Sequence, residues 1–110
     1  MAAFDQDKIF DTKAIRDTAD HLSIVSDNQA TPTKTIAVCN KLDQAVTCQL
    51  QGSFDASFAE VFNIGATFVI TASTNDWEEA SVYFPFIRVK ATCSVAPTTG
   101  GLTIYLLKTG

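Results

Sequence analysis

Hydrophobic and polar residues alternate along most of the chain from about residue 21 to the C-terminus. Because successive side chains of a β-strand point to opposite faces, this period of two predicts strands that bury one face and leave the other polar. The longest example is 84–94, in which Ile87, Val89, Ala91 and Cys93 would face the core and Arg88, Lys90 and Thr92 would face solvent. Further strands are predicted near 22–25 and over 35–40, 45–52, 60–64, 67–73 and 102–107, with core bulk from Phe62, Ile64, Phe68 and Ile70.

Turn-forming residues separate these strands. The segment 40–44 predicts a β-hairpin between 35–40 and 45–52, because it joins two alternating runs through a short polar loop. Gly65-Ala66 and the Pro- and Gly-containing stretch 96–101 mark further turns. About seven or eight short strands at this spacing are typical of an all-β β-sandwich or jelly roll. A chain of 110 residues has room for one such core.

One segment within this region departs from the alternation. The spacing of Asn75 and Asp76 to Glu78 and Glu79 matches a capping box, which predicts one or two turns of helix over 75–81. The alternative is an irregular loop that places Trp77 over the edge of the sandwich.

Residues 1–20 mix charges with isolated apolar residues. This pattern predicts an extended N-terminal arm with one short strand, separate from a β-sandwich domain over 21–110. A helix over 13–22 is an alternative, since Ile15, Ala19 and Leu22 have helical spacing. The arm would either fold back on its own domain or lie across a neighbouring molecule. Deleting 1–12 is therefore expected to leave thermal unfolding nearly unchanged.

The charge of the chain argues against two classes of partner. The net charge is −4, and the eight Lys and Arg residues are scattered along the sequence. Nucleic-acid binding and polybasic membrane binding both depend on clustered positive charge, so both are disfavoured. No apolar run is long enough to span a membrane, and the acidic N-terminus does not resemble a secretory signal. We expect the chain to be made in a cytoplasm.

The three cysteines, Cys39, Cys48 and Cys93, form no C-x-x-C pair. Their number and spacing suggest neither a disulfide framework nor a zinc site. We interpret them as reduced thiols, with Cys48 and Cys93 facing the core. A disulfide between these two is the alternative.

Catalytic chemistry finds little support in the sequence. The only histidine, His21, would have to serve any Ser-His-Asp or Cys-His site, and it lies in the irregular N-terminal region. The carboxylate pairs Glu78/Glu79 and Asp5/Asp7 are typical of solvated turns, and no glycine-rich phosphate loop occurs. We therefore predict no enzyme activity, no cofactor and no metal. Carbohydrate binding is a weaker alternative, because eight of the eleven aromatic residues are Phe and sugars usually stack on Trp or Tyr.

Three stretches resemble a known kind of protein. They are LDQAVTCQLQGSFDASF (42–58), ATFVITASTNDW (66–77) and YFPFIRVKATCSVAPTTGGLTIYLLK (83–108). Together they resemble small β-sandwich proteins encoded in the structural modules of tailed bacteriophages, most of all capsid decoration or cement proteins. The resemblance consists of the residue types at matching strand and turn positions, and it does not include a binding or catalytic motif. Residues 1–20 do not share it.

The resemblance implies a virion component that binds the major capsid protein on the outer surface of the capsid as a homodimer or homotrimer. A tail, collar or fibre-base module is the alternative within the same class. Such a protein works through affinity, summed over many weak contacts on a symmetric lattice. The candidate protein-interface residues are the apolar residues of the expected arm together with the single tryptophan: Phe4, Ile9, Phe10, Ile15 and Trp77.

Overall fold

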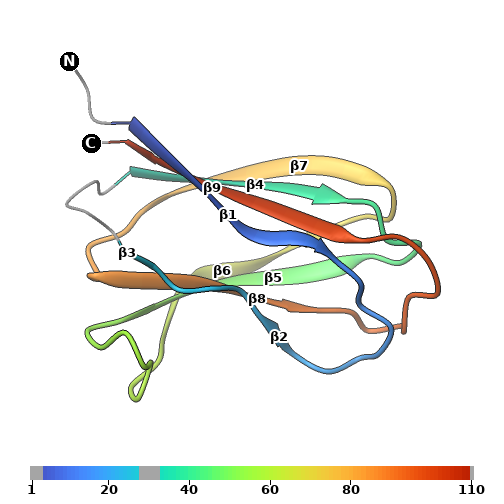
Figure 1. Ribbon diagram of the computed structural model, residues 1–110, viewed down its shortest axis with the longest axis horizontal. Helices are drawn as coiled ribbons and strands as arrows, with labels where there is room; N and C mark the ends of the chain where they lie inside the picture. The colour runs from blue at the N-terminus through green and yellow to red at the C-terminus, as the bar shows by residue number, and fades with distance from the viewer. Residues whose placement is uncertain (1–3, 28–32, 110) are drawn as a thin grey trace.

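The computed structural model describes residues 4–27 and 33–109, and over these residues it contains strands and no helix (Figure 1). The strands are, in chain order, β1 (Phe4–Lys13), β2 (His21–Leu22), β3 (Ser26–Asp27), β4 (Thr33–Asn40), β5 (Val46–Ser53), β6 (Phe62–Ile70), β7 (Thr74–Ser81), β8 (Phe86–Thr92) and β9 (Leu102–Thr109). They form two antiparallel sheets, one on each side of a single hydrophobic core.

The strand order is that of a jelly roll. Sheet A has the order β1-β9-β4-β7, and sheet B has the order β2-β8-β5-β6. Both β2 and β3 pair with β8, so they are two halves of one interrupted strand. Counted in this way, successive strands lie in opposite sheets except for β5 and β6, which are neighbours in sheet B, and this is the jelly-roll arrangement. The predicted all-β sandwich is confirmed.

The core lies between the inner faces of the sheets. Alternate residues of β4, β8 and β9 are buried, as the period of two predicts. Cys48 and Cys93 are buried too, and all three cysteines are free thiols. β4, β8 and β9 therefore follow the hydrophobic pattern of the sequence closely, whereas nearly every residue of the central strand β5 is buried.

The predicted hairpin between 35–40 and 45–52 is wrong. β4 belongs to sheet A and β5 to sheet B, and the connection between them crosses from one sheet to the other. Buried Asn40 holds this crossing: its Nδ2 donates to the carbonyl oxygens of Gln44, Ile70 and Thr71, each at 3.1 Å, and its Oδ1 accepts from the backbone N–H of Leu42. Alternation shows which residues face inward, but it does not show which sheet a strand joins.

The segment 75–81 is neither a helix nor an irregular loop. It lies within β7, which pairs with β4 along its whole length, from Thr33↔Ser81 to Asn40↔Thr74. The hydrogen bonds of this ladder outweigh the local capping pattern, as tertiary context commonly does. The residues 60–73, predicted as two strands, contain one strand, β6, with a bulge where Gly65 has a φ of 69°.

Residues 4–20, which were expected to form an extended arm, lie against the sandwich. β1 is an edge strand of sheet A and pairs with β9 from Phe4↔Thr109 to Lys13↔Leu102. Ile9, Phe10 and Ile15 are buried in the core. Of the two arrangements considered, the segment folds back on its own domain, and the helix over 13–22 does not form.

The environments of the cysteines predict selective labelling. Burial raises the pKa of the Cys48 thiol to about 12 and also raises the pKa of Cys93, whereas Cys39 is partly exposed on the outer face of β4. Because the thiolate is the reactive form, we expect a thiol reagent at neutral pH to label only Cys39 in the folded protein and all three thiols after denaturation. Mass spectrometry of the labelled chain measures this. Cys39→Ser should leave no reactive thiol in the folded state, and rapid labelling of Cys48 or Cys93 would contradict the packing.

Candidate interaction surfaces

One flank of the sandwich is closed by a buried polar network between β1, β3 and β9. Lys108 Nζ donates to Asp7 Oδ2 and to the carbonyl oxygen of Asp27, both at 2.9 Å, and to Ser26 Oγ at 3.3 Å. Ser26 also donates to Asp7, and this bond, with a smaller effect from Lys108, lowers the pKa of the Asp7 carboxyl. These contacts join the edges of the two sheets, so this flank offers no open core.

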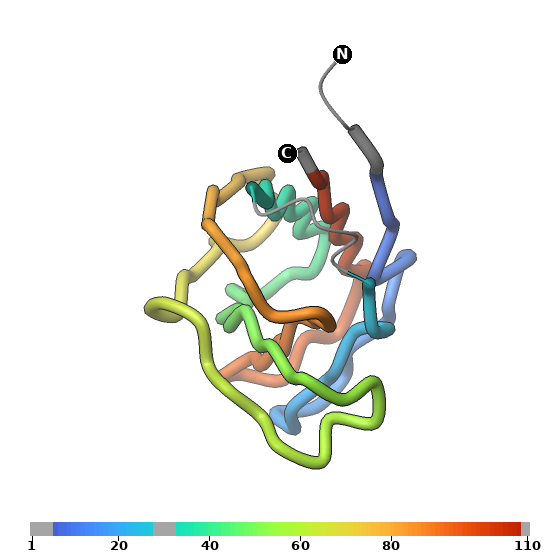
Figure 2. Tube along the Cα trace, turned by 90° about the vertical axis from the view of Figure 1, so that its left-hand side faces the viewer, coloured from blue at the N-terminus to red at the C-terminus, as the bar shows by residue number. Residues whose placement is uncertain are grey.

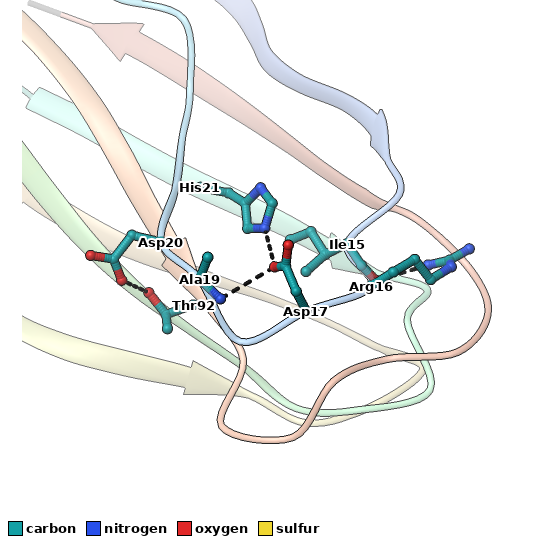
Figure 3. A network of polar contacts seen from close by, with 7 residues as sticks. All are labelled: Ile15, Arg16, Asp17, Ala19, Asp20, His21 and Thr92. Carbon is teal, nitrogen blue, oxygen red and sulfur yellow. Dashed lines mark hydrogen bonds and ion pairs between the residues drawn. The ribbon is translucent and has the colours of Figure 1, made fainter.

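The connection from β1 to β2 is held by a second polar network (Figure 3). His21 Nε2 lies 2.7 Å from Asp17 Oδ1, and the same oxygen accepts from the backbone N–H of Ala19. These bonds lower the pKa of Asp17, with the His21 bond as the largest cause. Asp20 accepts a hydrogen bond from Thr92 at 2.7 Å, which ties the connection to the end of β8. His21, the residue that a catalytic site would need, thus holds a loop in place.

Two further features of the described residues bear on chemistry. No group of three or more His, Cys, Asp or Glu side chains in residues 4–27 and 33–109 is placed to hold a metal ion. Over the same residues, no helix of sufficient length and hydrophobicity to cross a membrane is found.

The opposite flank is open. β6 is the edge of sheet B and β7 is the edge of sheet A, and Figure 2 shows this yellow side of the molecule across from the blue β1–β3 side. Between the two edges lies a groove of about 250 Å³. Its floor is apolar and includes the core residues Ile36 and Leu50, and its rim carries Glu78 and Glu79. We call it the flank groove.

An exposed aromatic cluster lies at the end of the sandwich where β5 ends and β6 and β8 begin. Phe54, Phe62 and Phe84 are in mutual contact, with ring centroids 5.1–5.9 Å apart. Phe54 is 70% exposed and Phe62 is 43% exposed. We call these three rings the aromatic cluster. Its exposed apolar area, formed by adjoining rings, is the kind of surface that marks a protein-binding site.

The loop between β5 and β6 holds this cluster in place. Buried Phe58 packs its ring 4.2 Å from the Arg88 guanidinium, and Arg88 Nε donates to Gln51 Oε1 at 2.9 Å. Ser53 and Asp55 add hydrogen bonds within the loop. The rings are thus positioned before any partner arrives, which reduces the entropy lost on binding.

Of the predicted interface residues with described side chains, Trp77 alone is exposed. It is 61% exposed on the outer face of sheet A, above a shallow hollow of about 250 Å³ that Ala37 and Cys39 also line. Ile9, Phe10 and Ile15 are core residues and cannot act as surface anchors in this structure. The backbone of Phe4 lies in β1, but its side chain lies outside the described residues.

The sequence reasoning missed the aromatic cluster. Phe62 was expected to add bulk to the core, and Phe54 and Phe84 were assigned no role at the surface. Phenylalanine carries no polar group, so its type alone favours burial. The available signal was the spacing of Phe54, Phe58 and Phe62, which fall within nine residues around one predicted loop.

The sequence matches no protein-family model and no curated protein. Solved structures do share the fold. They include the PBSX exported protein XepA, with a TM-score of 0.72 and 11% identity over 100% of this chain and 37% of that chain. They also include the structure of the Gx strain of infectious bursal disease virus, with a TM-score of 0.53 and 10% identity over 98% of this chain and 32% of that chain. The chain spans about a third of the length of these two proteins, and at such identities the likeness is one of fold.

Proposed function

We propose that this protein is a structural component of a phage virion. It serves as a capsid decoration protein that binds the outside of the major-capsid shell as a homodimer or homotrimer and stabilises the shell. The observation that carries the proposal is the aromatic cluster, in which the exposed rings of Phe54 and Phe62 contact each other and Phe84, and Phe84 packs against the core. The fold, shared with the PBSX exported protein XepA and with the structure of infectious bursal disease virus, supports it.

The physical chemistry suits binding without catalysis. Covering one large apolar side chain contributes about 1.5–3 kcal/mol, so a few rings per subunit give a modest affinity. Repetition over a symmetric lattice raises the total strength of attachment without any new kind of contact. A decoration protein therefore needs a surface such as the aromatic cluster, and it needs no cofactor.

Co-sedimentation with expanded capsids of the phage that encodes the protein tests the proposal. We expect saturable binding at micromolar concentration and a higher temperature of capsid disruption. Phe54→Ser should weaken binding about tenfold or more, because it removes an exposed ring worth about 1.5–3 kcal/mol when covered. Val95→Ser is the matched control, since Val95 is also exposed but lies in the connection between β8 and β9; it should bind like the native protein.

Three outcomes would contradict the proposal or part of it. Failure to sediment with capsids at micromolar concentration would exclude the decoration role. Binding to purified tails but not to capsids would assign the protein to the alternative tail, collar or fibre-base class. Equal loss of binding in Phe54→Ser and Val95→Ser would remove the aromatic cluster as the docking surface.

A further inference from the structure

The flank groove reaches the hydrophobic core between the two sheet edges, whereas the opposite flank is closed. On the β1–β3 side, the network around Asp7 and Lys108 joins the sheets, whereas β6 and β7 form no strand pair with each other. Buried Ile36 and Leu50 lie at the floor, and the partly buried Ile64, Phe68 and Ala80 pack around them. A volume of about 250 Å³ is below the range of about 300–1,000 Å³ common for small-molecule pockets. The groove suits individual side chains of a polypeptide better than a small ligand.

β6 provides a backbone edge beside this groove. Its nine residues, Phe62–Ile70, include no charged residue and no proline. It pairs with β5 on one side and with no described strand on the other. Natural proteins usually protect a long apolar edge strand with Lys, Pro or a covering segment, and the bulge at Gly65 is the one such device in β6. An edge of this kind is suited to pairing with an extended segment of another chain.

β7 gives the groove its charge. Ile36 and Glu78 are directly paired, so Glu78 lies on the same inner face as the core residue Ile36. Glu79 lines the rim beside it. In the sequence, the stretch 42–87, which includes β6 and β7, contains no Lys or Arg and six acidic residues: Asp43, Asp55, Glu60, Asp76, Glu78 and Glu79. The partner that complements this surface is basic.

A second copy of the chain does not meet this requirement. Pairing of β6 with β6 around a two-fold axis would place β7 opposite β7 and bring the acidic residues of both copies together. The other edge of sheet A, β1, carries three Asp and two Lys residues and is not basic either. The charges therefore favour a different protein.

We infer that the flank groove receives an extended, basic segment of a partner protein, which pairs with β6 through its backbone and places a Lys or Arg beside Glu78. Alternate side chains of such a segment point the same way, so an apolar residue two positions along covers the floor at Ile36 and Leu50. The inference rests on the proposed function for one point, that the partner is another virion protein. The chemistry of the groove is independent of that point.

Fluorescence anisotropy with synthetic peptides tests the inference on the intact protein. The probe is a labelled peptide of the repeat Lys-Ser-Val-Ser, which places Lys and Val two positions apart on one face of an extended strand. The comparison peptide has Glu in place of each Lys. We expect saturable binding of the basic peptide alone, weakened by added salt. Glu78→Lys should raise the Kd about tenfold or more, and Glu78→Gln should raise it by a smaller factor.

Two controls separate the groove from general charge. Glu60→Lys makes the same charge change outside the groove, in the connection between β5 and β6, and should change the Kd less than about twofold. A basic peptide methylated at alternate backbone nitrogens cannot donate the hydrogen bonds of strand pairing and should not bind.

Several results would overturn the inference. They are equal binding of the acidic peptide, an unchanged Kd for Glu78→Lys, equal binding of the methylated peptide, or sedimentation showing a dimer that Glu78→Lys dissociates. The last result would make a second copy the occupant. Peptide binding without capsid binding would support the groove as a binding site and exclude the decoration role. Capsid binding without peptide binding would support the decoration role and exclude the groove as the site for a basic segment.

Discussion

Deleting residues 1–12 is expected to abolish the cooperative thermal unfolding transition. The deletion removes nearly all of β1, and with it the ladder to β9 and the buried side chains of Ile9 and Phe10. Truncating one buried Phe costs about 3–5 kcal/mol, and a domain of this size has about 5–15 kcal/mol of stability in total. Loss of the whole strand exceeds what the remaining fold can supply. The sequence alone predicts a nearly unchanged thermal transition for this deletion, and the structure predicts the opposite.

The deletion also removes Asp7 from a site with two buried lysines. Lys34 and Lys108 are paired neighbours on β4 and β9, and both are buried. Burial, with a smaller effect from Lys108, lowers the pKa of Lys34 to about 8. Asp7 forms an ion pair with Lys108 at 2.9 Å. Removing one partner of a buried ion pair is strongly destabilising, because the remaining charge is left in a poorly solvated place.

Circular dichroism and calorimetry of the truncated chain measure this effect. Two single substitutions on β1 calibrate it. Phe10→Ala should lower the free energy of unfolding by about 3–5 kcal/mol, and Lys8→Ala, at an exposed position of the same strand, should change it by no more than about 0.5 kcal/mol. A truncated protein that unfolds at the native temperature would show that β1 is not an integral part of the sandwich.

The pattern of β1 explains why the sequence suggested an arm. Its pairing with β9 shifts register between Lys8 and Phe10 and again between Phe10 and Lys13. These irregularities turn two adjacent residues, Ile9 and Phe10, toward the core. A bulged strand therefore loses the period of two that identifies a strand. The regular strands β4, β8 and β9 keep that period, and the sequence predicted them well.

β7 was missed for a different reason. Its inner face carries Asp76, Glu78 and Ala80, opposite Val38, Ile36 and Lys34 of β4, so its inward positions are mostly charged. Charged residues that point inward are a common protection of edge strands. The inward-pointing acidic residues of β7 interrupt the hydrophobic alternation by which a strand is recognised in the sequence. The same residues give the flank groove its acidic rim. Residues that depart from the pattern of the fold thus coincide here with the candidate binding surface.

The choice of sheet also lies outside a local pattern. Nothing in the residues 40–44 distinguishes a hairpin from a crossing between sheets, and the outcome depends on Asn40 meeting the carbonyl oxygens of Ile70 and Thr71. Those partners lie about thirty positions along the chain, as the separations of 30 and 31 residues show. Contacts at such a distance in sequence decide topology, and a single sequence does not reveal them.

The second large effect concerns the contact between this crossing and the connection from β8 to β9. Gly100 has a φ of 88°, and a Cβ placed on it would lie 1.8 Å from the carbonyl oxygen of Lys41. The two connections are joined by the backbone bond from Lys41 N–H to the Gly101 carbonyl at 3.0 Å and by the bond from Thr98 N–H to Asp43 Oδ1 at 2.8 Å. Neither backbone can move away without breaking these bonds.

Gly100→Ala is therefore expected to lower the free energy of unfolding by about 2–5 kcal/mol. The left-handed backbone contributes about 1–2 kcal/mol, and the steric clash of the added Cβ with the Lys41 carbonyl contributes about 1–3 kcal/mol. Gly65→Ala is the matched control, because Gly65 has a φ of 69° but no atom within 4 Å of the added Cβ. It should show the backbone cost alone, about 1–2 kcal/mol. Urea unfolding of the two variants gives the difference directly. Equal losses would mean that the two connections do not touch at Gly100. They would also mean that this contact does not hold β4 and β9 together at this end of the sandwich.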